Sequence, residues 1–293
     1  MKILILGVNG GFGKLFHTLL SKENLKISGV DLQPEAEGEI APENYISCNL
    51  FSPNESTLKE ISVADVILVC LPEKVVYPLL PTILQHARKE TLIVETTSVK
   101  STIASIINER AIQREVLSIN PMFAPDLGMK GSSMVAVRFN PNSATAWFSS
   151  FVEKQGCRIT WMTTEEHDML TAMTQVATHA AIISFGFMLE KMNYDADRNI
   201  PVSPPPHLNL LALFSRIKTA NPEVYWKIQT DNPYGEMARE ALLGSLSSFN
   251  DMIKNADKEG FEQLMNHSLS SEKNHAQKLA EECREIFAHR FKG

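Results

Sequence analysis

The glycine loop near the N-terminus constrains the fold more than any other part of the chain. Residues 3–16 read ILILGVNGGFGKLF, a short apolar run followed by three spaced glycines and a helical pattern. This G-x-x-G-x-x-G spacing is a variant of the dinucleotide fingerprint, with one extra residue before the middle glycine. A strand, a tight turn and a helix N-terminus in this order let pyrophosphate oxygens reach backbone amides. The predicted cofactor contacts in the loop are Gly7, Asn9, Gly10, Gly11, Phe12 and Gly13.

An acidic residue ends the second apolar run. Residues 25–30 read as a strand, and Asp31 follows directly. A carboxylate at this place accepts hydrogen bonds from both ribose hydroxyls and repels a 2′-phosphate, which favours NAD over NADP. The alternative is a turn-forming Asp before residues 32–34. Leu71 and Pro72 follow another buried run, and they are predicted to line the cofactor site.

The apolar pattern changes character near residue 160. Before it, strand-like runs alternate with helical stretches, which is typical of a parallel sheet covered on both faces. After it, Thr163 and Glu166 have the spacing of a capping box, and only helical patterns follow. The predicted fold is α/β, with an N-terminal Rossmann-type doubly wound parallel sheet in residues 1–162 and an all-helical C-terminal domain in residues 163–293. The expected strands are 2–6, 25–30, 66–70, 91–95, 115–119 and 133–139, and the expected later helices are about 208–220, 222–230, 234–257 and 261–290.

Composition limits the partners and the compartment. The net charge of −6 over 293 residues argues against nucleic acid or an anionic membrane as the main partner. The four cysteines form no C-x-x-C pair and no secretory signal opens the chain, so a cytoplasmic protein with reduced thiols is expected. Residues 169–189 carry no Asp, Glu, Lys or Arg and are long enough to span a bilayer. Their Thr, Gln, His and Ser residues favour a helix buried in the helical domain instead.

Four later segments resemble the prephenate dehydrogenase family. They read ETTSVKS (95–101), NPMFAPDLG (120–128), EEHDMLTAMTQVATHAA (165–181) and FSRIKTANPEVYWKI (214–228), in the order that the family has. The resemblance implies oxidative decarboxylation of a small anionic cyclohexadiene: hydride leaves ring C4 for NAD, and carbon dioxide leaves C1 as the ring becomes aromatic. It also implies a homodimer formed through the helical domain.

The resemblance assigns roles to two residues of the first domain. Ser98 matches a serine near the nicotinamide and the substrate's 4-substituent, and Lys100 matches a nearby structural or electrostatic group that is expected to contact substrate. Ser98 is also a candidate N-cap for the helix that follows it. His167 and Asp168 have no third ligand beside them in the sequence, so no metal is expected.

The resemblance assigns four substrate residues to the helical domain. His179 matches a catalytic histidine that faces the substrate, and Gln175 lies one turn earlier on the same face. Arg216 matches an arginine that holds a substrate carboxylate, and Tyr225 matches an aromatic residue near it. Without the resemblance, His179 reads equally as a core histidine and Arg216 as half of a surface ion pair.

Asn120 departs from the family pattern, which has a histidine before Pro121. That histidine helps remove the proton of the substrate's 4-hydroxyl, whereas an amide accepts hydrogen bonds but no proton. An inactive relative, a replacement base such as His179 or water, and a different 4-substituent each explain the change. We favour an amino group, since its nitrogen lone pair assists hydride loss without a base. Asn120 would then serve a branch of the family that converts 4-amino-4-deoxyprephenate to 4-aminophenylpyruvate.

Other functions remain as alternatives. Asn120 is also compatible with prephenate or arogenate as substrate, and with a non-catalytic NAD-binding protein. β-Hydroxyacid and 6-phosphogluconate-type dehydrogenases have a similar domain order but place a catalytic lysine on the long helix. Residues 169–189 contain no lysine, which disfavours that class.

Overall fold

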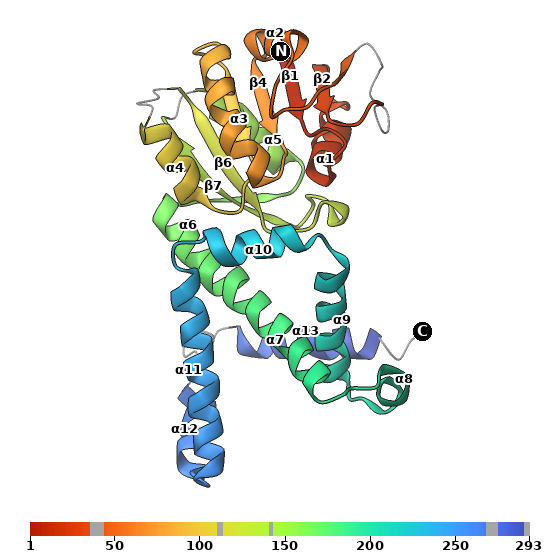
Figure 1. Ribbon diagram of the computed structural model, residues 1–293, viewed down its shortest axis with the longest axis vertical. Helices are drawn as coiled ribbons and strands as arrows, with labels where there is room; N and C mark the ends of the chain where they lie inside the picture. The colour runs from red at the N-terminus through yellow and green to blue at the C-terminus, as the bar shows by residue number, and fades with distance from the viewer. Residues whose placement is uncertain (36–43, 110–113, 141–142, 268–274, 290–293) are drawn as a thin grey trace. The chain divides into compact units, whose positions relative to one another are not determined.

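The computed structural model describes residues 1–35, 44–109, 114–140, 143–267 and 275–289. The chain divides into two compact units, residues Met1–Leu170 and Thr171–Gly293. The first contains the sheet and the second is helical (Figure 1). Each unit is therefore a domain with its own architecture.

One sheet of eight strands, counted over the described residues, forms the centre of the first unit. Its order is β3-β2-β1-β4-β5-β6-β7-β8. All neighbouring strands are parallel except β6 and β7, which pair antiparallel. The order β3-β2-β1-β4-β5-β6 is that of a dinucleotide-binding sheet. The strands are β1 (Lys2–Leu6), β2 (Lys26–Asp31), β3 (Tyr45–Ser47), β4 (Val66–Val69), β5 (Leu92–Glu95), β6 (Val116–Pro121), β7 (Ser133–Phe139) and β8 (Arg158–Trp161).

Helices cover both faces of this sheet, which explains why its central strands are apolar on both sides. Ile3 and Ile5 of β1 pack with α1 (Gly11–Leu20) and α5 (Ser143–Lys154) on one face. Leu4 and Leu6 point the other way and pack with α2 (Glu55–Val63), α3 (Glu73–His86) and α4 (Lys100–Glu109). Successive residues of a strand face opposite sides, so a doubly covered strand needs an unbroken apolar run. The predicted doubly wound sheet is confirmed.

The two compact units meet between Leu170 and Thr171, whereas the sequence pattern changes at residues 162–163. Helix α6 (Thr164–Thr171) begins with the predicted capping box: the Thr163 amide donates to Glu166 Oε2 at 2.7 Å, and the Glu166 amide donates to Thr163 Oγ1 at 3.2 Å. Residues up to Leu170 nevertheless belong to the sheet unit. The reason is a long-range contact, because Asp168 of α6 accepts hydrogen bonds from the first amides of α4.

The second unit consists of helices. The charge-free segment 169–189 is not one regular helix: a π-helical stretch, Ala172–Ala177, separates α6 from α7 (Thr178–Lys191). By length and composition Thr164–Lys191 could cross a membrane, and 28% of its apolar window is buried. The expected burial of this helix is therefore only partial within one chain. The others are α8 (Ala196–Asn199), α9 (Pro205–Thr219), α10 (Pro222–Asp231), α11 (Gly235–Lys254), α12 (Lys258–His267) and α13 (Ala276–His289).

The last predicted helix differs from the structure. Residues 261–290 were expected to form one helix, but α12 ends at His267 and α13 begins at Ala276. Residues 268–274 and 290 lie outside the described residues. The bounds of helices α9, α10 and α11 differ from the predicted ones by no more than three residues at either end.

Candidate active site

The glycine loop forms a cradle that no larger residue fits. Gly7 has φ +84°, and a Cβ on it would overlap the carbonyl oxygen of Cys70. A Cβ on Gly13 would overlap the carbonyl oxygen of Gly7, because α1 starts hard against the end of β1. Gly10 is the N-cap of α1 and has no capping side chain, which leaves helix amides available to an anion. The cradle thus fits a dinucleotide pyrophosphate.

Asp31 lies beside this loop. Its Oδ2 accepts from the Asn9 amide at 2.9 Å, and its Oδ1 accepts from the Leu32 amide at 2.7 Å. A carboxylate has about four acceptor positions, so capacity remains for ribose hydroxyls. A Cβ on Gly7 would come within 2.8 Å of Leu71 Cδ2, and Pro72 is the N-cap of α3. The predicted cofactor residues therefore gather at the carboxyl ends of β1, β2 and β4.

The loop after β6 packs against the glycine loop. The rings of Phe12 and Phe123 meet edge to face, with centroids 5.8 Å apart. A Cβ on Gly11 would come within 2.7 Å of Pro125 Cγ. Asn120, near the end of β6, is 4% exposed. The unusual amide thus lies at the same edge of the sheet as the nucleotide cradle.

Ser98 lies between β5 and α4, and it does not cap the helix. Its backbone amide donates to Glu73 Oε1 at 3.0 Å, and α4 begins only at Lys100. The amide of Lys100 donates to Asp168 Oδ1 and that of Ser101 to Asp168 Oδ2, each at 2.9 Å. The expectation that Ser98 is the N-cap is therefore wrong, because a carboxylate from α6 occupies that role. Within the described residues the Ser98 hydroxyl has no hydrogen-bond partner, so it remains available.

Lys100 is an internal charge of the first unit. Its side chain is fully buried, and Nζ donates to the carbonyl oxygens of Thr97 at 2.6 Å and Ile119 at 2.8 Å. The third neighbour is Glu95 Oε1 at 3.5 Å. Burial lowers the pKa of Lys100, against the opposing charges of Glu95 and Asp168. An ammonium has three donors, and all three meet oxygens of the same domain. The expected substrate contact is thus replaced by a structural role.

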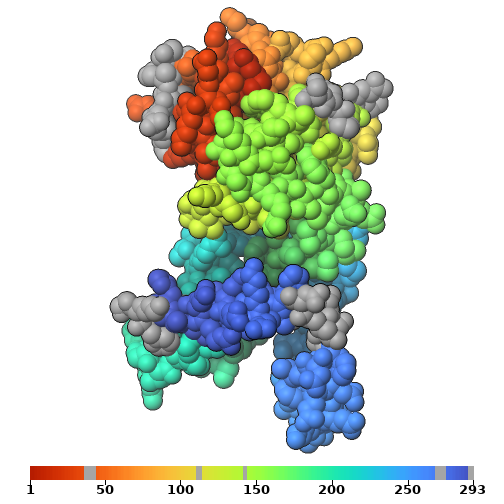
Figure 2. Space-filling model, turned by 180° about the vertical axis from the view of Figure 1, so that it is seen from behind, coloured from red at the N-terminus to blue at the C-terminus, as the bar shows by residue number. Residues whose placement is uncertain are grey.

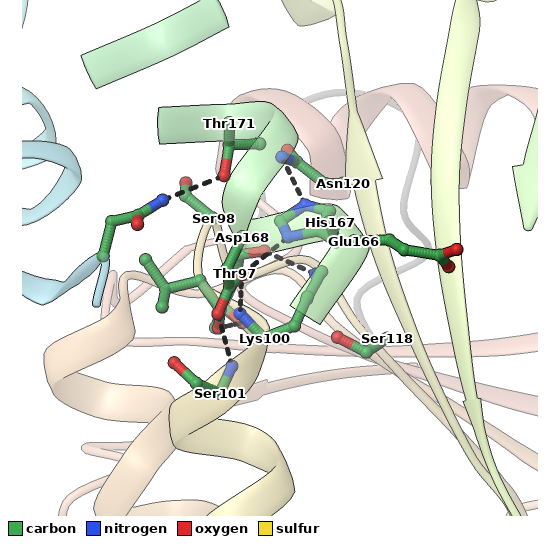
Figure 3. Close-up of polar contacts among 12 residues, drawn as sticks. Thr97, Ser98, Lys100, Ser101, Ser118, Asn120, Glu166, His167, Asp168 and Thr171 are labelled. Atoms are coloured by element: carbon green, nitrogen blue, oxygen red, sulfur yellow. Dashed lines mark hydrogen bonds and ion pairs between the residues drawn. The ribbon is translucent and has the colours of Figure 1, made fainter. Parts of the chain in front are cut away.

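A chain of hydrogen bonds leads from α6 to Asn120 (Figure 3). His167 Nδ1 lies 2.7 Å from Asp168 Oδ1, and His167 Nε2 lies 3.0 Å from Asn120 Nδ2. Burial lowers the pKa of His167, although hydrogen bonding to Asp168 opposes the shift. Burial alone would raise the pKa of Asp168, yet the bonds from His167 and the two α4 amides hold it below its usual value. The histidine is thus favoured as neutral and the aspartate as charged.

Sequence reasoning missed this chain of contacts. It weighed His167 and Asp168 only as metal ligands. Across the part of the chain that the structure describes, no group of three or more His, Cys, Asp or Glu side chains is placed to hold a metal. The contact between Asn120 and His167 joins positions 47 residues apart, which no local pattern reveals.

The second unit gathers the other predicted substrate residues. The rings of His179 and Tyr225 lie edge to face with centroids 5.0 Å apart. His179 Nδ1 is buried and, among the described residues, has no hydrogen-bond partner. Burial and then the charge of Arg216 lower the pKa of His179. Gln175 is half-buried in the π-helical stretch, and Arg216 is exposed. This cluster has the groups to bind an anionic side chain.

A dinucleotide-binding sheet domain followed by a helical domain with such a cluster defines a nucleotide-dependent dehydrogenase. Two family models match the chain: "Prephenate dehydrogenase, nucleotide-binding domain" over residues 20–136 and "Prephenate dehydrogenase, dimerization domain" over residues 163–267. The chain belongs to the prephenate dehydrogenase family. It is accordingly an enzyme that uses NAD, and the resemblance of its four motifs to this family is confirmed.

Individual relatives give the same family. A 4-amino-4-deoxyprephenate dehydrogenase from Streptomyces pristinaespiralis is 30% identical over 286 residues, covering 98% of this chain and 96% of the relative. A probable arogenate/prephenate dehydrogenase from Methanocaldococcus jannaschii is 25% identical, covering 90% of this chain and 59% of the relative. The fold is similar to that of A. aeolicus prephenate dehydrogenase in complex with hydroxyphenyl propionate and NAD+, with a TM-score of 0.71, 17% identity and coverage of 93% and 98%.

Proposed function

We propose that the chain converts 4-amino-4-deoxyprephenate to 4-aminophenylpyruvate, with release of carbon dioxide and reduction of NAD. The observation that carries the proposal is Asn120: a buried amide stands where the chemistry of a 4-hydroxyl calls for a base. The name of the Streptomyces pristinaespiralis relative supports the same substrate.

The amino substituent removes the need for a base at this position. Loss of hydride from C4 leaves positive charge that the nitrogen lone pair stabilises, and loss of carbon dioxide from C1 returns two electrons to the ring. Nitrogen donates its lone pair more readily than a hydroxyl oxygen does, so this charge is stabilised without help from a base, and the aromatic amine keeps both N–H bonds of the neutral substrate. Bound NAD supplies the hydride acceptor. Asn120 accepts an N–H hydrogen bond and orients the amino group for this step.

The remaining site residues are proposed to orient the substrate, to bind its carboxylate or to bind NAD. In this proposal Ser98 contacts the 4-substituent from the side of β5. Arg216 binds a substrate carboxylate through its planar fork. His179, Gln175 and Tyr225 line the region of the substrate side chain. Asp31 binds the ribose of NAD, and the amides around Gly10 bind its pyrophosphate.

Prephenate or arogenate is the second candidate substrate. His179 is the observation that favours it. Its Nδ1 is buried with no hydrogen-bond partner among the described residues, and its pKa is lowered, so the ring is neutral near neutral pH. A neutral imidazole of this kind is suited to accept the proton of a 4-hydroxyl. The relative from Methanocaldococcus jannaschii has a name of this type.

We infer that the enzyme is a cytoplasmic homodimer joined through the helical domain. The chain contains the family's dimerization domain. Within the described part of the chain, the second unit has a small packed core of Ala172, Val176, Ile228 and Ala238, and Ile182 is buried apart from it. An apolar groove between α7 and α11 lies open beside it. A second copy would cover this surface, which a lone chain exposes to water.

The decisive experiment compares the two substrates. Initial rates of NADH formation are measured with prephenate and with 4-amino-4-deoxyprephenate, for the wild type and for Asn120→His. We expect the wild type to prefer the amino substrate in kcat/KM. Asn120→His should gain prephenate activity by about 10²-fold, the scale of one general base. Asn120→Ala is the matched control, which should lose amino activity without gaining prephenate activity. A wild type that prefers prephenate contradicts the proposal.

A further inference from the structure

We propose that His167, held by Asp168, is a positioning residue that fixes which end of the Asn120 amide meets the substrate. It directs the amide oxygen, and not the amide nitrogen, toward the 4-substituent. This inference rests on the proposed function, since it concerns how the same site recognises nitrogen. It assigns a specificity role to two residues that contact neither substrate nor cofactor in this account (Figure 3).

Asp168 determines where the histidine carries its proton. Its two oxygens accept from the first two amides of α4, at the positive end of that helix. This environment favours a charged carboxylate, which is an acceptor only. His167 Nδ1 lies 2.7 Å from Asp168 Oδ1, so Nδ1 must be the protonated nitrogen that donates.

The other ring nitrogen then selects one end of the amide. With the proton on Nδ1, a neutral ring presents a bare lone pair at Nε2. The amide atom 3.0 Å away must therefore be the donor, Nδ2 of Asn120. Its Oδ1 has no hydrogen-bond partner among the described residues and remains to accept from the substrate. A doubly protonated ring would reverse this, because Nε2–H would take the amide oxygen and leave Nδ2 facing the substrate.

The surroundings of His167 disfavour that second proton. The ring is fully buried. Among the charged groups that face it, Lys100 of α4 repels a cationic ring, whereas Asp168 and Glu95 of β5 favour one. Asn120 on β6 is uncharged. The cost of burying a cation adds to the effect of Lys100, so the neutral ring is retained.

The orientation of the amide matters to the reaction itself. The nitrogen lone pair must flow into the ring as hydride leaves C4. An N–H donor directed at the amino nitrogen would hold that lone pair and oppose the step. An oxygen that accepts from the amino group leaves the lone pair free and stabilises the positive charge that develops on the N–H. His167 should therefore affect kcat more than KM.

The first test reads the proton position without any substrate. The ring nitrogens of His167 are observed by NMR in histidine-labelled wild-type enzyme near neutral pH, with His167→Gln used to assign the signals. The expected result is a protonated Nδ1 and a bare Nε2. A protonated Nε2, in either a neutral or a cationic ring, would overturn the proposal.

The second test uses two substitutions that both remove the bond to Asp168 and differ toward Asn120. Leu in His167→Leu offers Asn120 no acceptor, whereas the amide oxygen in His167→Gln can accept from Nδ2. We expect His167→Leu to lower kcat with the amino substrate about tenfold or more, with KM and NAD affinity within about threefold. His167→Gln should recover most of that loss. Equal kcat values in the two variants would overturn the proposal, because a merely structural histidine gives no such difference.

Failure of this inference and failure of the proposed function are separable. If the wild type prefers prephenate, the proposed function is wrong, and the variant pair measured on prephenate still decides the positioning role. If neither substrate is turned over, the proton position found by NMR decides it alone. If His167→Leu does not fold, the NMR result on the wild type again decides.

Discussion

Asn120 does not titrate, so the hydrogen bond that its amide makes depends on the protonation state of the residue beside it. His167 is the neighbour that contacts it, and its pKa is lowered chiefly by burial. His167 therefore affects both the proposed substrate specificity and the stability of the fold. Because the buried ring resists protonation, the free energy of unfolding also decreases at acid pH.

The pH dependence of stability follows from this shift. Between the lowered pKa of folded His167 and about 6.5 in the unfolded chain, the unfolded state binds a proton that the folded state does not. The stability that His167 contributes is therefore present above about 6.5 and is lost as the pH falls toward the folded pKa. Urea unfolding at a series of pH values should show a shallower acid loss in His167→Gln than in the wild type. Parallel curves for the two proteins would contradict this expectation.

Gly13 gives a second prediction at this scale. A Cβ there would overlap the carbonyl oxygen of Gly7, which is backbone and cannot move aside. Gly13→Ala should therefore destabilise the protein by about 1–3 kcal/mol or more and abolish NAD binding. Thermal unfolding and calorimetric titration with NAD measure the two effects. Gly244→Ala in α11 is the control. Apart from the backbone of its own helix, no described atom lies within 4 Å of the added Cβ, so its unfolding and NAD affinity should stay near those of the wild type. Normal NAD binding by Gly13→Ala would show that the cradle tolerates a side chain.

The sequence predicted the residues whose chemistry depends on local pattern. The glycine loop and Asp31 follow from strand and turn spacing, and the structure has them together at one edge of the sheet. Lys100 shows the limit of such reasoning. Its burial among Thr97, Ile119 and Glu95 depends on how strands pack, and sequence spacing carries no information on that.

At the scale of elements, helix α4 is capped by a residue from a distant helix. The amides of Lys100 and Ser101 donate to Asp168, which lies nearly seventy positions further along the chain. This contact also explains why α6 belongs to the sheet unit.

Replacing this carboxylate should cost more than removing an ordinary cap. Asp168→Asn keeps the shape but loses the charge that two helix amides and His167 share, so we expect a loss of about 2–3 kcal/mol near neutral pH. Asn54 caps α2 by accepting from the Thr57 amide alone, and Asn54→Ala should cost about 1 kcal/mol. Urea unfolding of both variants makes the comparison. Equal losses would mean that Asp168 acts as no more than a neutral cap.

Three of the elements that sequence reasoning missed are short or polar. Strand β3 has three residues, and β8 (Arg158–Trp161) has no buried residue. Neither is long enough or apolar enough to produce a period-two pattern, since edge strands bury little. Helix α2 has only two buried residues, Thr57 and Ile61, so its helical pattern is weak. The strands that are buried on both faces were the ones predicted.

At the scale of the whole molecule, the two units differ in how well one chain covers its apolar residues. The first unit has two extensive cores, one on each face of the sheet. The second has a four-residue core within its described part, and large apolar residues on α7 and α11 remain exposed. Helices α12 and α13, the bluest elements in Figure 2, also lie at the surface with nearly all of their residues exposed. In the proposed homodimer, a second copy would cover this exposed apolar surface.

The dimer can be tested at the open groove of α7 and α11. Leu243 and Leu246 line this groove and are 69% and 63% exposed in the single chain. If a second copy covers them, Leu246→Asp buries a charge at the interface and should convert dimer to monomer. Sedimentation velocity at several protein concentrations measures the change. Phe51→Asp is the matched control, because Phe51 is 60% exposed on the sheet unit and its replacement should leave the dimer intact.

NAD binding by Leu246→Asp distinguishes loss of the dimer from loss of the fold. The cradle of Gly7 and Gly13 lies wholly within the first unit, so monomeric Leu246→Asp should still bind NAD. Its turnover should fall, because the cluster of His179, Arg216 and Tyr225 belongs to the domain that has lost its cover. A Leu246→Asp enzyme that remains dimeric would instead place the contact between copies on another face of the helical domain. A wild type that sediments as a monomer would contradict the proposed homodimer.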